Sequence, residues 1–171
     1  AVHSGAGVGG HAGEARAAAM ISAAMTQRAE ELTARGTAFV TATVVRVQKP
    51  ASVRPGSVAL VFEDGTIDGF VGGVCTEHSV RAYSLQAMRT GAAVLLRVVP
   101  FDELANAAGE YAVADDGTVT VQNPCLSGGA IDLFLEPVLP APRVLVVGST
   151  PIAAALLRIG PELGLAVVAA E

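Results

Sequence analysis

The chain has 171 residues, of which 51% are apolar and 16% charged, and its formal net charge is -5. This composition predicts a packed globular protein and excludes a disordered one. An acidic chain without a basic face is not expected to bind nucleic acid. Two cysteines cannot form a disulfide framework, and we find neither a signal peptide nor a membrane-spanning run, so we expect a cytoplasmic protein.

Residues 1–13 are rich in Gly and Ala and are predicted to be a flexible tail. Apolar residues then recur at helical spacing over 14–35, and Gly36 is a suitable helix stop. β-Branched residues over 38–47 predict a strand. Two prolines and a glycine break both periodicities in the loop over 49–56.

Two hairpins are predicted by Asp-Gly turns, the first a type I′ turn: strands 57–63 and 66–71 around Asp64-Gly65, and strands 111–114 and 118–122 around Asp115-Asp116-Gly117. Between the hairpins, 77–90 predicts a helix with Thr76 as its N-cap and Gly91 at its stop. Further strands are predicted over 93–99 and over 131–135, the second closed by Pro137.

The sequence pattern changes after residues 138–142, a linker that contains prolines. Strand 143–148, helix 151–163 and strand 165–170 form a β-α-β pattern. One such unit cannot cover both faces of a parallel sheet, so we expect it to be the start of a truncated Rossmann-like domain. The predicted fold class is α/β, with a mixed-sheet domain over 14–137 followed by this first β-α-β unit over 143–171.

Both cysteines occur in glycine-rich segments, Gly72-Gly73-Val74-Cys75-Thr76-Glu77 and Cys125-Leu126-Ser127-Gly128-Gly129. Such segments leave backbone N–H groups open to a ligand, and the first precedes a helix whose positive end stabilises a thiolate or a bound anion. Glu77 complements the same dipole. Each segment alone is equally well explained by a buried cysteine or a β-bulge. Together they predict one site built from two distant segments.

Arg54 stands in a rigid Arg-Pro-Gly turn, from which a guanidinium can bind a phosphate bidentately; an ordinary exposed loop arginine is the simpler alternative. A metal site formed by His78, Cys75 and Cys125 lacks the paired spacing of zinc sites, so no metal is predicted.

A weaker nucleotide-binding signal occurs in the β-α-β pattern. Gly148 and Ala153 stand where a dinucleotide fingerprint has its first and third small residues, but Thr150 replaces the second glycine. Glu171 ends the second strand, where a ribose-binding carboxylate belongs. An NAD(P) site formed by Gly148, Thr150 and Glu171 therefore stays an alternative.

In this order, these segments resemble the XdhC/CoxI family, which assists the maturation of molybdenum hydroxylases. The resemblance is carried by Thr43–Val47, Arg54–Gly56, Asp64-Gly65, Gly72–Glu77, Cys125 with Gly128-Gly129, Ile131–Pro137 and Val144–Gly148. Two departures, Val74 directly before the first cysteine and Leu126-Ser127 after the second, suggest a subgroup of the family.

The resemblance implies a chaperone rather than an enzyme, with no catalytic residues. It would bind molybdenum cofactor (molybdopterin or its dinucleotide form), support its sulfuration with a cysteine desulfurase, and deliver it to an apo-enzyme of the xanthine or CO dehydrogenase type. On this reading the cysteines contact the molybdenum or sulfur end, Glu77 orients a pterin donor, and Arg54 with the glycine amides holds the phosphate. The glycines are Gly72, Gly73, Gly128 and Gly129. We also expect a homodimer. The alternatives are an NAD(P)-binding oxidoreductase and a bridging module without a cofactor.

Overall fold

The computed structural model describes residues 9–100, 111–113, 117–123 and 129–170, and it has an α/β fold. The chain divides into two compact units, Ala1–Val138 and Leu139–Glu171. Each unit is described by itself.

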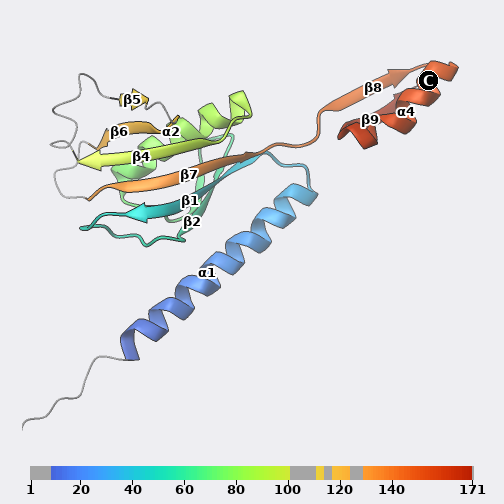
Figure 1. The fold of residues 1–171 in the computed structure, drawn as a ribbon. Coiled ribbons are helices and arrows are strands. Elements are labelled where there is room, and N and C mark those ends of the chain that lie inside the picture. The colour runs from blue at the N-terminus through green and yellow to red at the C-terminus, as the bar shows by residue number, and fades with distance from the viewer. Residues whose placement is uncertain (1–8, 101–110, 114–116, 124–128, 171) are drawn as a thin grey trace, which may run out of the picture. The chain divides into compact units, whose positions relative to one another are not determined.

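A seven-stranded sheet in the order β3-β2-β1-β7-β4-β6-β5 forms the first unit (Figure 1). Its strands are β1 (Phe39–Val47), β2 (Val58–Phe62), β3 (Ile67–Gly69), β4 (Val94–Pro100), β5 (Tyr111–Val113), β6 (Val119–Asn123) and β7 (Ile131–Val138). The sheet is mixed, because β4 and β6 pair in parallel while the other neighbours pair antiparallel.

In the described part of the first unit, two helices accompany the sheet, α1 (Gly9–Ala34) and α2 (Val74–Thr90). The predicted tail 1–13 is wrong from Gly9 onward. Helix formation is cooperative, so an alanine-rich helix extends into residues that would not start one alone. The predicted stops are confirmed, since Gly36 and Gly91 both have positive φ. Gly36 also donates to the carbonyl of Thr33 (3.0 Å), a bond typical of helix ends.

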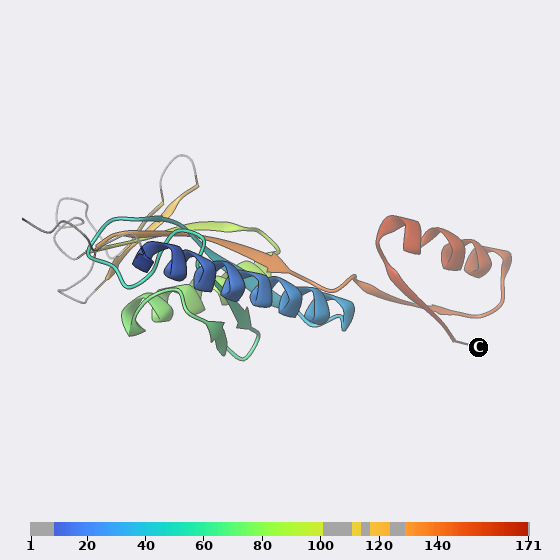
Figure 2. The same ribbon diagram turned by 90° about the horizontal axis from the view of Figure 1, so that it is seen from below.

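Along the strands, alternate side chains point into the core. Val40, Ala42 and Val44 of β1 are buried in one cluster with Val80 and Ala87 of α2. Figure 2 shows the sheet nearly edge-on, with α2 on one side of it. A second, smaller cluster joins α1 to the sheet, through Leu32, Phe39 and Leu60. At about 25 cal/mol per Å² of apolar surface, this burial is the main stabilising contribution.

The hairpin between β2 and β3 forms as predicted, but its turn differs from the predicted type. A type I′ turn needs positive φ at both central residues, whereas among the described residues only glycines have positive φ, here Gly65 at 80°. The side chain of Asp64 instead accepts the N–H of Thr66 at 2.8 Å. This hydrogen bond lowers the pKa of Asp64 from its usual value, because it stabilises the carboxylate form.

Strand β7 continues past the proline that was predicted to close it. Pro137 pairs with Val40 of β1, and the strand ends at Val138, the residue with which the linker was predicted to begin. On the other side of β7, pairing with β4 ends at Leu135. A proline is tolerated at a position where one side of its strand has no neighbour to bond.

The second unit is the predicted β-α-β arrangement. It consists of β8 (Arg143–Val147), α4 (Pro151–Ile159), a 3₁₀ turn η1 (Pro161–Leu163) and β9 (Ala166–Ala170). The two strands are parallel. The helix ends earlier than predicted, because Pro161 has no N–H to continue its hydrogen bonds.

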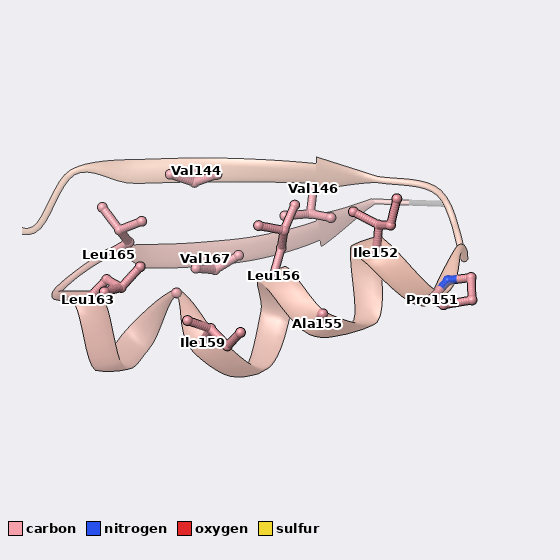
Figure 3. A pocket seen from close by; sticks show the side chains of 11 residues that line it. Val144, Val146, Pro151, Ile152, Ala155, Leu156, Ile159, Leu163, Leu165 and Val167 are labelled. Atoms are coloured by element: carbon pink, nitrogen blue, oxygen red, sulfur yellow. The ribbon is translucent and has the colours of Figure 1, made fainter.

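An open apolar cavity of about 350 Å³ lies between α4 and the two strands (Figure 3). It is lined by side chains from both strands and from the helix, among them Val144, Val146, Ile152, Leu156, Ile159 and Val167. On the described part of the chain, no helix has both the length and the apolarity needed to cross a membrane.

Candidate functional site

The predicted site residues of the first unit follow or precede strand ends at one edge of the sheet. Strand β1 ends at Val47, which pairs with Ile131 at the start of β7. Strand β4 ends at Pro100 opposite Asn123, the last residue of β6. Loops that leave these strands therefore emerge at a common edge.

Arg54 stands in a well-defined turn at this edge. The N–H of Ser57 donates to the carbonyl of Arg54 (3.0 Å), and Gly56 has a φ of 87°, which is the geometry of a type II turn. The turn is also bonded to β1, since the N–H of Gly56 donates to Val44 (2.8 Å). The Arg54 side chain is exposed on this rigid turn.

The first glycine segment is the start of α2 itself. The helix begins at Val74 with Gly73 as N-cap, so the predicted N-cap Thr76 is wrong and Cys75 lies in the first helical turn. Thr76 is buried against Gly72, where an added Cβ would lie 2.8 Å from the Cβ of Thr76. Because Gly72 also has a φ of 142°, the chain enters the helix one turn earlier than the sequence indicates.

Among the described residues, no side chain caps the N-terminal end of α2. No described atom beyond the chain neighbours of Gly73 lies within 4 Å of the position that a Cβ would occupy there. The first-turn N–H groups of a helix have no partner within the helix, and its dipole is positive at this end. Glu77, half-buried, carries the acidic group of this turn.

Cys75 is half-buried and disulfide-bonded. In this form its sulfur is not a thiolate. The one other cysteine in the sequence, Cys125, lies outside the described residues, as does Gly128.

Gly129 belongs to the same edge, but its backbone has a structural role. Its N–H donates to the carbonyl of Pro50, and the N–H of Gln48 donates to Ala130 (2.7 Å). The predicted open amide at Gly129 is therefore engaged by the chain itself.

A shared core holds the Arg54 loop and the glycine segment at this edge. Val53 and Val71, which directly precede Arg54 and Gly72, are both buried in the main core cluster. The structure thus anchors both segments in the main core, at the end of the sheet where these loops emerge. Among the described residues, no three His, Cys, Asp or Glu side chains gather as a metal site.

In the second unit, the predicted nucleotide-binding residues are partly engaged. Gly148 has a φ of 101° and donates its N–H to Ala170 (3.0 Å). Thr150 is the N-cap of α4, and its hydroxyl accepts the N–H of Ala153 (3.2 Å). Sequence reasoning missed this cap, although Thr-Pro before a helix is its usual signal. Glu171 lies outside the described residues.

Replacing Thr150 with alanine is expected to destabilise α4 by about 1 kcal/mol, because the N–H of Ala153 loses its acceptor. Hydrogen exchange of the α4 amides in the full chain should become about fivefold faster. Ser149→Ala, at an exposed neighbouring hydroxyl, is the control and should leave the rate unchanged. Equal exchange in both variants would contradict the cap.

Comparisons with known proteins give two results. Residues 32–99 match the model of the XdhC and CoxI family. A solved structure described as a xanthine dehydrogenase from Bacillus halodurans is 20% identical to this chain with a TM-score of 0.43, and the match covers 76% of this chain and 32% of that one. A search of the curated proteins finds no match.

Proposed function

Because residues 32–99 of this chain match the model of the XdhC and CoxI family, we propose that the protein binds molybdenum cofactor, supports its sulfuration and delivers it to an apo molybdenum hydroxylase. The match supports the association with a molybdenum hydroxylase. Cofactor binding, a cysteine desulfurase as sulfur donor, and the handover itself are the parts of the proposal that need experiment.

The proposal rests on the positions of a charged side chain and of uncapped N–H groups within residues 32–99. This region contains Arg54 on a rigid exposed turn, and the uncapped first turn of α2 with Cys75 and Glu77. The two segments are anchored in the same core cluster. An exposed guanidinium and uncapped helical N–H groups are the donors that a phosphate needs.

These residues fit the anionic part of the cofactor. No described side chain fills the space beside Gly73, which favours the approach of a phosphate oxygen to the N–H groups that follow it. When bound, the cofactor supplies a molybdenum centre on a dithiolene, a soft site suited to a thiolate. Cys75 can offer a thiolate only after a dithiol reduces its disulfide, which moves two electrons and two protons from the dithiol to the two sulfurs.

The NAD(P) alternative has less support. The hydroxyl of Thr150 already accepts the N–H of Ala153, in the turn where a pyrophosphate would approach the helix. A bridging module without cofactor would give no role to the first turn of α2, which no described side chain caps.

The proposal is tested by incubating the reduced full chain with molybdenum cofactor released from a molybdoenzyme, followed by gel filtration and detection of pterin fluorescence. We expect the pterin to co-elute with the protein, and Arg54→Ala to weaken binding about tenfold, the loss of one charge-assisted contact. Arg89→Ala, at an exposed arginine on α2, is the matched control. Absence of co-elution would reject cofactor binding, and saturable NADH binding would favour the alternative.

A further inference from the structure

An exposed aromatic ring follows strand β3, on the way to helix α2. Phe70 is 49% exposed, the largest exposed fraction among the aromatic side chains that the structure describes. Phe39, by contrast, is fully buried. A ring that is half in solvent leaves a flat apolar surface that a second flat ring can cover by stacking.

Packed atoms hold the backbone on both sides of this ring. Gly69 has a φ of 108°, and a Cβ there would lie 2.8 Å from the carbonyl oxygen of Val58. Val71 is fully buried in the main core cluster, and Gly72 is buried as well. The ring of Phe70 is therefore presented from a fixed position of the backbone.

The ring leaves the sheet at the same end as the Arg54 turn. Strands β2 and β3 pair antiparallel, with Gly69 at the end of β3 opposite Ala59 near the start of β2. Ser57, the residue before β2, closes the turn that Arg54 opens. The chain that leaves β3 at Phe70 thus begins beside the strand that the Arg54 turn enters.

The start of α2 is also near the ring. Gly73, the N-cap of α2, comes three residues after Phe70, a stretch that the backbone spans in at most about 11 Å. Gly73 and Val74 are exposed like the ring, whereas Val71 and Gly72 between them are buried. Phe70 is therefore a neighbour of both groups that are proposed to bind the phosphate.

From this placement we infer that Phe70 is the stacking surface for the flat ring of the ligand whose phosphate Arg54 and the first turn of α2 hold. The inference rests on the proposed function and adds a residue to its site. Molybdenum cofactor carries its phosphate on a short arm of a flat fused ring, so neighbouring parts of a protein must hold ring and phosphate. In the dinucleotide form, the nucleobase is a second flat ring that can stack in the same way.

The surroundings of Phe70 favour a small flat ligand over a protein partner. The exposed residues beside it include two glycines, Gly69 and Gly73, which permit close approach to the backbone. Val74, 82% exposed, is the one large apolar side chain that accompanies the ring within residues 69–74 at the surface. A specific protein interface needs a much larger patch, about 800 Å² per partner.

Substitutions that keep or remove the flat ring test the inference. The reduced full chain is incubated with molybdenum cofactor in its mononucleotide or dinucleotide form, and retained pterin is measured after gel filtration. We expect Phe70→Leu, which stays apolar but is not flat, to weaken retention about tenfold, the effect typical of losing one stacking contact. Phe70→Tyr should retain the cofactor within about twofold of the parent chain. Phe134→Leu, at a ring 38% exposed on β7, is the matched control.

A spectroscopic measurement reports the ring directly. The chain contains no tryptophan, so Phe70→Trp introduces a single indole whose emission should be quenched when the cofactor stacks on it. The same reporter at Phe134→Trp should not respond. A loss in Phe70→Leu with both cofactor forms assigns the pterin to Phe70, and a loss with the dinucleotide form alone assigns the nucleobase.

The outcomes separate this inference from the proposed function. A parent chain that retains neither form of the cofactor would overturn both. If the parent retains the cofactor and Phe70→Leu retains it equally well, the stacking role of Phe70 is excluded while cofactor binding stands.

Discussion

Replacing Gly129 with alanine is expected to destabilise the first unit by about 3 kcal/mol or more. A Cβ at this position would lie 1.7 Å from the carbonyl oxygen of Gln48 and 2.6 Å from its carbon. Neither atom belongs to a flexible side chain. The loop that carries them is bonded to this segment, since Pro50 accepts the N–H of Gly129 and Gln48 donates to Ala130. Relief of the clash therefore requires breaking these bonds.

Urea unfolding of the full chain, followed by circular dichroism, measures this effect. The matched control is Gly73→Ala, where φ is -75° and no atom of the described residues lies within 4 Å of the new Cβ. That change should cost less than about 1 kcal/mol, the usual difference between glycine and alanine at an N-cap. Equal stability losses for the two variants would show that the backbone of residues 48–50 leaves room for a Cβ at Gly129.

Oxidation and Cys75 should control cofactor retention, if the proposed function holds. The oxidised chain is expected to retain molybdenum cofactor at least about tenfold less well than the dithiol-treated chain, because a disulfide sulfur has no thiolate charge. Cys75→Ala should lose retention to a similar degree even in dithiol. The positive end of a helix dipole stabilises a thiolate, and Cys75 lies in the first turn of α2.

The measurement is pterin retained per protein after gel filtration, with and without dithiol. His78→Ala is the matched control, since His78 is exposed on the same helix and has no role in the proposal. If Cys75→Ala retains the cofactor as well as the parent chain in dithiol, the thiol contact is excluded. The binding measured for Arg54→Ala then tests the phosphate contact separately.

The sequence predicted the elements well where the cause is local. Runs of β-branched residues identified the long strands, and glycines with positive φ marked helix ends at Gly36 and Gly91. It failed where a tertiary contact decides. Thr76 has the chemistry of an N-cap, but its burial against Gly72 places it inside the helix. Pro137 breaks a strand only if a neighbouring strand lies on the side to which its N–H would point, and β4 pairs with β7 only as far as Leu135.

The candidate site was predicted in part for the same reason. Arg54 is placed by its own Arg-Pro-Gly turn, which the sequence indicates directly. Gly73 is not, because it caps a helix that was predicted to begin only after Thr76. The close contact of Gly129 with residues 48–50 joins segments about 80 positions apart, and no local pattern shows which glycine amide is taken. The ion pairs of Arg46 and Arg97 with Asp132 depend on the register of three strands, so the sequence around Asp132 does not indicate them.

Strand β1 has one extra residue, Val45, because its pairing with β7 passes from Val44 opposite Leu133 to Arg46 opposite Asp132. This residue matters for how relatives of the chain are aligned. Before Val45, even-numbered residues of the strand face the core, and after it the odd-numbered Val47 does. A homologue one residue shorter at this place would need a gap in the middle of a strand, where alignments normally penalise one. If the gap falls at Val45, regular register keeps the arginine opposite Asp132, whereas a gap at Arg46 leaves the valine there, so the position of the gap would separate chains that keep the outward guanidinium from those that do not.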